Sequence, residues 1–307
     1  MTKRRGGSGR AFERVTVLKP SRDLCGTTPE QFGELLERLA PLVEAAYLAR
    51  GERPGRQRAL GAGAKPNPFW FRLLVALTPL RQGITLRSTG AVFGIDEKSV
   101  RNYRDEVIGL LGRHGCQPPG AVRPIRTEAD LLEYLDSLPE ECCMVDGTQV
   151  PRSMPVDYEA QRAAWSGKLK DHVVTGTVVA DVTRRPVWFE ANPSGEGRTH
   201  DLTMLREQTN LLDVLARSKV TVLLDKAYRG LRHDIDEDRV VFPVMRPAHG
   251  KHSDADRLFN RDLSSMRMPA EHAIGRMKWW RAMRYWTRDP QQFGPTGKAI
   301  AVLASIT

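Results

Sequence analysis

The chain has 307 residues, of which 40% are hydrophobic, enough for one large domain or two smaller ones with proper cores. Its formal net charge of +10 favours a nucleic acid or another polyanion as partner. The basic N-terminus lacks an apolar core, the longest apolar run is too short for a bilayer, and the four cysteines form no zinc spacing. We therefore expect a cytoplasmic protein without a signal peptide, membrane span or zinc site.

The first third of the chain is predicted to be helical. Residues 1–26 are expected to form a disordered basic tail and residues 27–115 a helical domain. Thr28 to Gln31 form a capping box that predicts a helix start, Pro41 is expected to interrupt this helix, and a second short helix should reach about Leu48. A basic loop over residues 51–68 is then expected, followed by a buried helix over residues 69–81 that Gly83 ends.

Residues 85–104 predict two short helices joined by a tight turn. Gly94 is expected to close the first helix with a positive φ, Asp96 to cap the second, and the small Gly90 to let the two helices approach. This pattern is typical of a helix-turn-helix that contacts DNA, although a helical hairpin without that function has the same pattern. The side chains expected to remain outside on the second helix are Lys98, Ser99, Arg101, Asn102 and Arg104.

The remaining two-thirds predict a domain of strands and helices. Residues 116–139 are expected to be a linker and a short helix over about 128–138, and residues 140–307 an α/β domain. A buried strand should deliver Asp146 at its end, and a second, of parallel type, should do the same for Asp225. The other expected elements are strands over 173–182 and 187–191 with a hairpin between them, a helix over 202–216 capped by Thr199 or Asp201, a strand over 240–244, and a flexible basic segment over 246–261.

A helix predicted over residues 269–286 carries the most informative charge pattern. Helical spacing places Arg267, Glu271, Gly275 and Lys278 on one face, and Ala273, Met277 and Trp280 on another. A carboxylate between two cations, with a glycine that leaves room for a backbone, suits a metal site that acts on a polyanion. The alternative is a solvated helix face with ordinary salt-bridge spacing.

Taken together, the acids predict a two-metal site. Two carboxylates arrive from the ends of neighbouring strands, and a third arrives from a helix packed on the sheet. Hard oxygen ligands in this arrangement hold two Mg²⁺ ions about 4 Å apart, one beside the attacking oxygen and the other beside the leaving oxygen.

The ordered motifs resemble the bacterial DDE transposases of the insertion-sequence-five group, which are related to the Harbinger nucleases. The segments that carry the resemblance are Val145–Pro151, Tyr158–His172, Thr199–Leu202, Leu224–Gly230 and Ala270–Lys278, with residues 69–113 matching the helix-turn-helix module. The resemblance implies a ribonuclease H-like α/β catalytic domain, a mixed sheet flanked by helices, preceded by an all-α helix-turn-helix domain.

The resemblance also implies which residues act. Asp146, Asp225 and Glu271 become the catalytic acids and the ligands of two divalent metal ions, Mg²⁺ or Mn²⁺. Arg267 and Lys278 match the arginine and lysine of the tyrosine-arginine-glutamate-lysine signature, whose tyrosine is replaced here by Ser264.

The activity implied is that of a transposase. The protein would bind the terminal inverted repeats of an insertion sequence in double-stranded DNA, cut them by metal-dependent hydrolysis, and transfer the 3′-hydroxyl to target DNA. A homodimer or higher assembly on DNA, close to the nucleoid, is expected. Two other functions stay open, namely a decayed or domesticated transposase that only binds DNA, and a structure-selective nuclease without strand transfer.

Several side chains near the motifs receive supporting roles. Lys168, Lys170, Lys226 and Arg229 are candidates for phosphate contacts, with surface charge as the alternative, and His200 and Asp201 are candidates for a second shell around the acids. Trp279, Trp280 and Trp286 could stack on a flipped base, but packing is the expected role. The apolar end over residues 301–307 predicts that the helix there continues beyond residue 307.

Overall fold

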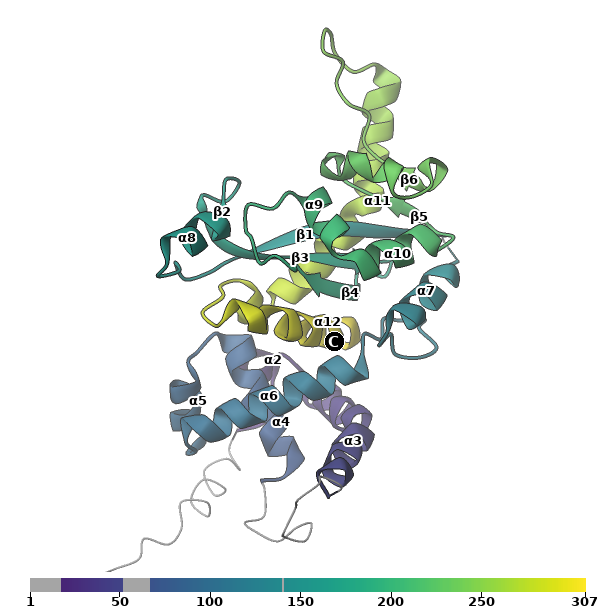
Figure 1. Cartoon of the computed structure of the whole chain (residues 1–307). Coiled ribbons are helices and arrows are strands. Elements are labelled where there is room, and N and C mark those ends of the chain that lie inside the picture. Colours follow the sequence, from purple (N-terminus) through teal and green to yellow (C-terminus); the bar gives the residue numbers. More distant parts are fainter. Residues whose placement is uncertain (1–17, 52–66, 140) are drawn as a thin grey trace, which may run out of the picture. The chain divides into compact units, whose positions relative to one another are not determined.

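The computed structural model describes residues 18–51, 67–139 and 141–307 (Figure 1). Residues 1–17 of the predicted tail and 52–66 of the predicted basic loop lie outside the described residues. The contacts divide the chain into two compact units. Unit 1 comprises residues up to His114 together with 280–282 and 307, and unit 2 comprises residues 115–279 and 283–306.

Unit 1 is built from helices. They are α2 (Arg22–Cys25), α3 (Pro29–Gly51), α4 (Phe69–Gln82), α5 (Leu86–Phe93) and α6 (Glu97–His114). The α3 capping box is confirmed, because the Thr28 amide donates to the Gln31 side chain at 3.0 Å and the Gln31 amide donates to the Thr28 hydroxyl at 3.2 Å.

Two predictions for unit 1 are wrong. Pro41 lies inside α3 and does not end it, because a proline removes only one hydrogen bond while the buried Leu35 and Leu39 hold the helix against its neighbours. The expected disordered tail cannot reach residue 26, because Ser21 caps α2 and Cys25 is fully buried.

The turn between α5 and α6 has the predicted local structure. Gly94 ends α5 with φ +67°, and Asp96 accepts the Ser99 amide at 2.8 Å at the start of α6. A Cβ on Gly90 would lie 2.6 Å from the backbone oxygen of Ile95, so only glycine allows this approach. The expected exposure of Arg104 is wrong, because α6 turns this side chain inward, where it is 9% exposed and pairs with Asp105.

Unit 2 is organised around a mixed sheet. Its strands are β1 (Cys142–Pro151), β2 (Trp165–Ser166), β3 (Asp171–Ala180), β4 (Pro186–Ala191), β5 (Thr221–Leu223) and β6 (Val240–Val241). The strands follow the order β2-β3-β1-β5-β6, and β4 also pairs with β3. Strand β3 is antiparallel to β1 and β4, whereas β5 is parallel to both β1 and β6.

Helices cover the sheet of unit 2 on both faces (Figure 1). They are α7 (Glu128–Asp136), α8 (Tyr158–Ala164), α9 (Asp201–Glu207), α10 (Thr209–Arg217), α11 (Asp254–Lys278) and α12 (Phe293–Ile306), with the 3-10 helices η1 (Lys226–His233), η2 (Glu237–Arg239), η3 (Arg281–Met283, partly in unit 1) and η4 (Pro290–Gln292). Over the described residues, none of the helices has the length and apolar character needed to cross a bilayer.

Side-chain alternation along the central strands separates the two faces. Cys143 and Val145 of β1 belong to a core cluster that includes the apolar side chains of α7, α9 and α10. Helix α12 packs on β4 through Phe189 and Phe293, whose ring centroids are 5.7 Å apart. Helix α11 contacts β1, β3 and β5. The face of β1 that carries Asp146 is therefore the one opposite to Val145.

Helix α7 forms where a short helix was predicted over about 128–138, and the contacts place it in unit 2. Leu131 and Leu135 are fully buried in the core cluster, and the Tyr134 hydroxyl donates to the buried carboxylate of Asp181 in the β3–β4 hairpin. In the division of the chain by contacts, unit 2 begins at Gly115. Packing of α7 on the sheet, which composition does not reveal, decides the boundary.

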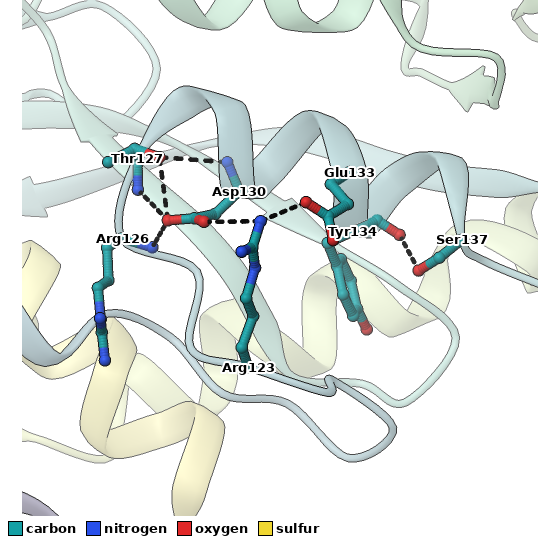
Figure 2. A network of polar contacts seen from close by, with 7 residues as sticks. All are labelled: Arg123, Arg126, Thr127, Asp130, Glu133, Tyr134 and Ser137. Atoms are coloured by element: carbon teal, nitrogen blue, oxygen red, sulfur yellow. Dashed lines mark hydrogen bonds and ion pairs between the residues drawn. The ribbon is translucent and has the colours of Figure 1, made fainter.

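The start of α7 is stabilised by a polar network (Figure 2). Asp130 accepts the backbone amides of Arg126 and Thr127 at 3.1 and 3.0 Å, and the Asp130 amide donates to the Thr127 hydroxyl at 3.2 Å. Burial raises the pKa of the Asp130 carboxyl, but these hydrogen bonds and the charge of Arg123 outweigh it and hold the pKa below its usual value. This capping box orders the chain directly after the proline-rich segment.

Two predicted helices of unit 2 have other bounds. The helix expected over 202–216 is broken between α9 and α10 at Gln208, whose buried side chain donates to the carbonyls of Glu190 and Ala191 at 3.0 and 3.2 Å. The helix expected from Pro269 begins at Asp254, because Ser253 and Asp256 form a capping box within the segment predicted to be flexible, and it ends at Lys278 instead of residue 286.

Candidate active site

Asp146 and Asp225 occupy equivalent positions on two neighbouring parallel strands. β1 and β5 pair only over Cys142–Met144 and Thr221–Leu223, and each acid lies two residues beyond the last pair, Met144 with Leu223. The prediction that Asp146 ends its strand is wrong, since β1 continues to Pro151 by pairing with β3. The two acids nevertheless share the opening that forms where β1 and β5 stop pairing.

The Asp146 carboxyl is the most perturbed acid of this opening. Burial raises its pKa to about 6, and the nearby charges of Asp201 and Asp225 raise it as well. Arg267 and a 2.9 Å hydrogen bond from the Gly147 amide oppose that rise. An acid that binds its proton this tightly lies where negative charge is concentrated and water is scarce.

Asp225 is held by its own helix start and by α11. Its Oδ1 accepts the Lys226 amide at 2.7 Å, which caps η1. The same oxygen lies 3.6 Å from an Nη1 of Arg267, whose side chain is only 15% exposed. A largely buried guanidinium therefore neutralises part of the negative charge that the two aspartates bring together.

Asp201 joins this acidic group from α9. The prediction that Thr199 or Asp201 caps the helix is wrong, because the His200 Nδ1 accepts the Leu202 amide at 3.3 Å and is the cap. Burial raises the pKa of the Asp201 carboxyl, the charge of Asp225 raises it too, and His200 and Lys168 oppose the rise. The carboxylate lies near Gly147, since a Cβ on this glycine would be 2.7 Å from the Asp201 Oδ1.

Tyr228 is a site residue that sequence reasoning did not single out. Its side chain on η1 is fully buried, and its hydroxyl finds no hydrogen-bond partner among the described residues. Burial, followed by the charges of Asp201 and Asp146, raises its pKa well above the usual value. The signals in the sequence were its position three residues after Asp225 and its place within the segment Leu224–Gly230 that carries the resemblance.

The charged face of α11 carries two cations, Arg267 and Lys278, that both lie near the acids. Near one end, Arg267 lies 3.6 Å from the Asp225 carboxylate, and its charge lowers the pKa of Asp146. At the other end, the charge of Asp146 raises the pKa of Lys278. Burial and the charge of Lys168 lower the pKa of the half-buried Lys278 ammonium, and Asp146 opposes this. Glu271 lies on the same face between the two cations and is exposed, and no atom lies within 4 Å of a Cβ placed on Gly275.

The other predicted contact residues are on the surface. Lys168, Lys170, Lys226 and Arg229 are all exposed. Lys168 lies near enough to act on both Asp201 and Lys278. The expectation that tryptophans pack is confirmed for Trp280 and Trp286, each 1% exposed, whereas Trp279 is 39% exposed. Ala273 and Met277 are buried, as the helical spacing predicted.

The oxygen atoms of these side chains are suitable ligands for a hard divalent cation, although the side chains are not arranged as a metal site. Carboxylate oxygens are the ligands that Mg²⁺ and Mn²⁺ prefer, and the buried Tyr228 hydroxyl without a partner adds a further oxygen. In the part of the chain that the structure describes, no three His, Cys, Asp or Glu side chains are arranged to hold a metal ion, so neither Glu271 nor Asp201 completes a ready ligand set with Asp146 and Asp225.

An acidic opening between parallel strands, faced by a basic helix in a basic chain, is typical of enzymes that transfer phosphoryl groups on nucleic acids. Comparison with known proteins agrees with this class. The model of the DDE superfamily endonuclease family matches residues 145–304, more than half of the chain, and the chain therefore belongs to this family. The predicted resemblance is confirmed at this level, while the insertion-sequence-five group stays a prediction.

A curated relative supports the same assignment. The chain is 25% identical over 236 residues to a protein of Microchaete diplosiphon described as a probable transposase for insertion sequence element IS702. The match covers 75% of this chain and 77% of the relative, so it extends into unit 1. No solved structure matches the chain.

Proposed function

We propose that the protein is a transposase that binds the terminal inverted repeats of an insertion sequence, cuts the DNA there and joins the liberated 3′-hydroxyl to target DNA. The observation that carries this proposal is the shared position of Asp146 and Asp225 beyond the last pair of β1 and β5, faced by the Arg267, Glu271 and Lys278 side of α11. Membership of the DDE superfamily and the name of the relative support it.

The catalytic unit is proposed to have a ribonuclease H-like fold. The support is its strand arrangement, in which β4, β3 and β1 form an antiparallel meander and β5 and β6 follow in parallel to β1. Ligand sites in such sheets form where neighbouring strands diverge at their carboxyl ends. The opening between β1 and β5 is such a place.

Asp146, Asp225 and Glu271 would hold two divalent cations. Cations bound there would supply Lewis-acid activation of the attacking oxygen and charge stabilisation of the leaving oxygen. Arg267 lies 3.6 Å from the Asp225 carboxylate, and its guanidinium would contact a phosphate of DNA bound at the acids. Because the attacking groups are water and then a 3′-hydroxyl, no covalent bond between protein and DNA is required.

The protonation of Asp146 sets a lower pH limit for this site. A carboxyl with a pKa of about 6 must release its proton before it can hold a cation. Cation binding should therefore weaken as the pH falls through about 6. Arg267 opposes this limit, since its charge favours the ionised carboxylate.

Unit 1 is proposed to bind DNA through a helix-turn-helix formed by α5 and α6. The support is the turn at Gly94 and the exposed side chains of Lys98, Arg101 and Asn102 on the first turns of α6. Ser99 is engaged by Asp96, to which its hydroxyl donates at 2.8 Å. Arg101 pairs with Glu97 at the surface, a contact worth well under about 1 kcal/mol that a phosphate can replace.

Phosphate contacts from unit 2 would complete the DNA interface. Lys168, Lys170, Lys226 and Arg229 are exposed on segments near the acids, and Lys278 lies on the α11 face beside them. A transposase must bring two element ends together, so a homodimer or larger assembly on DNA is part of the proposal. The net charge of +10 supports the expectation that phosphate contacts contribute much of the affinity.

One reaction separates this function from its two alternatives. The protein is incubated with a labelled duplex that carries the inverted repeat, a target plasmid, and Mg²⁺ or Mn²⁺. Cut duplex together with label joined to the plasmid supports the transposase. Cutting without joining indicates a nuclease, and retarded duplex without cutting indicates a DNA-binding protein. The Asp146→Asn, Asp225→Asn double variant is the control for contaminating nucleases.

A further inference from the structure

The structure contains an oxygen-rich space on the side of Gly147, directly beside Asp146. A Cβ on Gly147 would be 2.7 Å from the Asp201 Oδ1 and 3.4 Å from the Tyr228 hydroxyl oxygen. A methyl group cannot fit at 2.7 Å from a carboxylate oxygen without a shift of that side chain. The absence of a side chain at residue 147 therefore lets two oxygen-bearing side chains approach the strand that carries Asp146.

Asp201 is not required for the structure of its own helix. His200, and not Asp201, accepts the first free amide of α9. Among the described residues, no ion pair or hydrogen bond uses the Asp201 carboxylate, although it is half-buried and lies near the charges of His200, Lys168, Asp225 and Asp146. A partly buried carboxylate without a partner is costly, and a bound cation or a hydrogen-bond donor would lower that cost.

The Tyr228 hydroxyl is a second, independent sign of a ligand in this space. The side chain is 0% exposed, and its hydroxyl lacks a partner among the described residues. Buried hydroxyls are nearly always hydrogen-bonded, and one left without a partner destabilises the fold. The hydroxyl and the Asp201 carboxylate both lie close to the position that a Cβ on Gly147 would occupy.

The strand arrangement allows α9 to reach the same opening as α11. β1 and β5 stop pairing after Met144 and Leu223, and the residues that follow lie between the helices on the two faces of the sheet. Arg267 enters from the face covered by α11, and Asp201 enters from the face on which α9 packs. The sheet thus places a carboxylate from α9 opposite the charged face of α11, with Asp146 and Asp225 between them.

We propose that Asp201 is an additional oxygen ligand of the divalent-cation site formed by Asp146 and Asp225, and that the Tyr228 hydroxyl donates to the Asp201 carboxylate and positions it. This proposal rests on the proposed function, since it adds a residue to the same site. It differs from the expectation that Asp201 only supports the acids from outside. It also explains why a glycine follows Asp146.

Direct measurement of Mn²⁺ binding by the full-length protein tests the proposal without relying on catalysis. Titration calorimetry at pH 7.5 is performed on the wild type and on Asp201→Asn, with Glu207→Gln as the matched control that removes one exposed charge from the same helix. Asp201→Asn should weaken binding by about tenfold or more, and Glu207→Gln should leave it unchanged. Tyr228→Phe should weaken binding by about tenfold, as for other groups that orient a ligand.

A double-variant cycle protects the test against misfolding. Gly147→Ala keeps every carboxylate but pushes Asp201 away, so it should weaken Mn²⁺ binding, and this effect should be absent when Asp201→Asn is already present. Equal effects of Gly147→Ala in both backgrounds would mean that it acts through Asp146, and would overturn the proposal. Circular dichroism and thermal unfolding check that each variant is folded.

The outcomes separate this proposal from the proposed function. Loss of binding in Asp146→Asn with undiminished binding in Asp201→Asn overturns the role of Asp201 and leaves the function standing. Absence of Mn²⁺ binding in the wild type overturns both. Weakened binding in Asp201→Asn and Tyr228→Phe, with the Glu207→Gln control unchanged, supports both.

Discussion

Replacement of Asp146 by asparagine should stabilise the cation-free protein at neutral pH. Burial and two neighbouring aspartates raise the pKa of this carboxyl from 3.8 to about 6, so the folded protein holds the proton more tightly than the unfolded chain. The stability associated with the protonated acid is complete below about pH 4 and is lost as the pH rises through about 6. Asparagine remains neutral and can still accept the Gly147 amide.

The magnitude follows from the size of the shift. A rise of about two pKa units corresponds to about 3 kcal/mol, since each unit is worth about 1.4 kcal/mol. Relaxation around the ionised carboxylate lowers this value, and we expect the free energy of unfolding of Asp146→Asn to exceed that of the wild type by about 1–3 kcal/mol at pH 7.5. Near pH 4 the difference should fall below about 1 kcal/mol.

Urea unfolding in the presence of a chelator measures this difference at both pH values. Asp213→Asn is the control, because Asp213 is exposed and pairs only at the surface with Arg217, so its effect should stay below about 0.5 kcal/mol. Added Mg²⁺ should narrow the gap between Asp146→Asn and the wild type, since only the latter binds the ion well. A variant that is less stable than the wild type at pH 7.5, or a difference that does not depend on pH, would contradict the reasoning.

Three further predictions concern other parts of the chain. Gly90→Ala should destabilise unit 1 by about 1–3 kcal/mol in thermal unfolding, because the added methyl group meets a backbone carbonyl at 2.6 Å, and an unchanged midpoint would count against the tight turn. Lys98→Ala and Arg101→Ala should each weaken binding of the repeat and lower the slope of log affinity against log salt by about 1, whereas slopes equal to that of the wild type would remove α6 from the interface. Arg267→Met should move the pH midpoint of Mn²⁺ binding upward, because the guanidinium lowers the pKa of Asp146, and a midpoint that stays in place would refute this coupling.

Local signals predicted much of the fold correctly. The capping box at Thr28, the positive φ of Gly94 and the parallel strand before Asp225 all depend on a few neighbouring residues, and all are found. Where tertiary packing competes with a local rule, the prediction fails. Pro41 and Pro269 lie within helices that packing sustains, and the Asp146–Gly147 pair, a turn signal by itself, continues β1 because β3 pairs with it.

The site could be predicted only in part for the same physical reason. Acids next to buried strands pointed to Asp146 and Asp225, because the carboxyl ends of parallel strands meet at one edge. The approach of Asp201 and Tyr228 to Gly147 depends on how α9 and η1 pack across the sheet, and no spacing along the chain encodes this distance. The inward orientation of Arg104 was missed although helical spacing places it on the face of the buried Val100 and Ile108, because its charge favoured a surface position.

Cleavage at the element end by matched acid variants tests the central claim most directly. A duplex carrying the inverted repeat that flanks the protein's own coding sequence is incubated with Mg²⁺ or Mn²⁺ and the wild type, Asp146→Asn, Asp225→Asn or Glu271→Gln, and strand cuts are mapped at single-nucleotide resolution. The account predicts a cut at the repeat end by the wild type, and retained binding without cutting by all three variants. Cutting by any variant at the rate of the wild type would contradict the role of that acid, and a wild type that binds but cuts with neither metal would contradict the proposed activity.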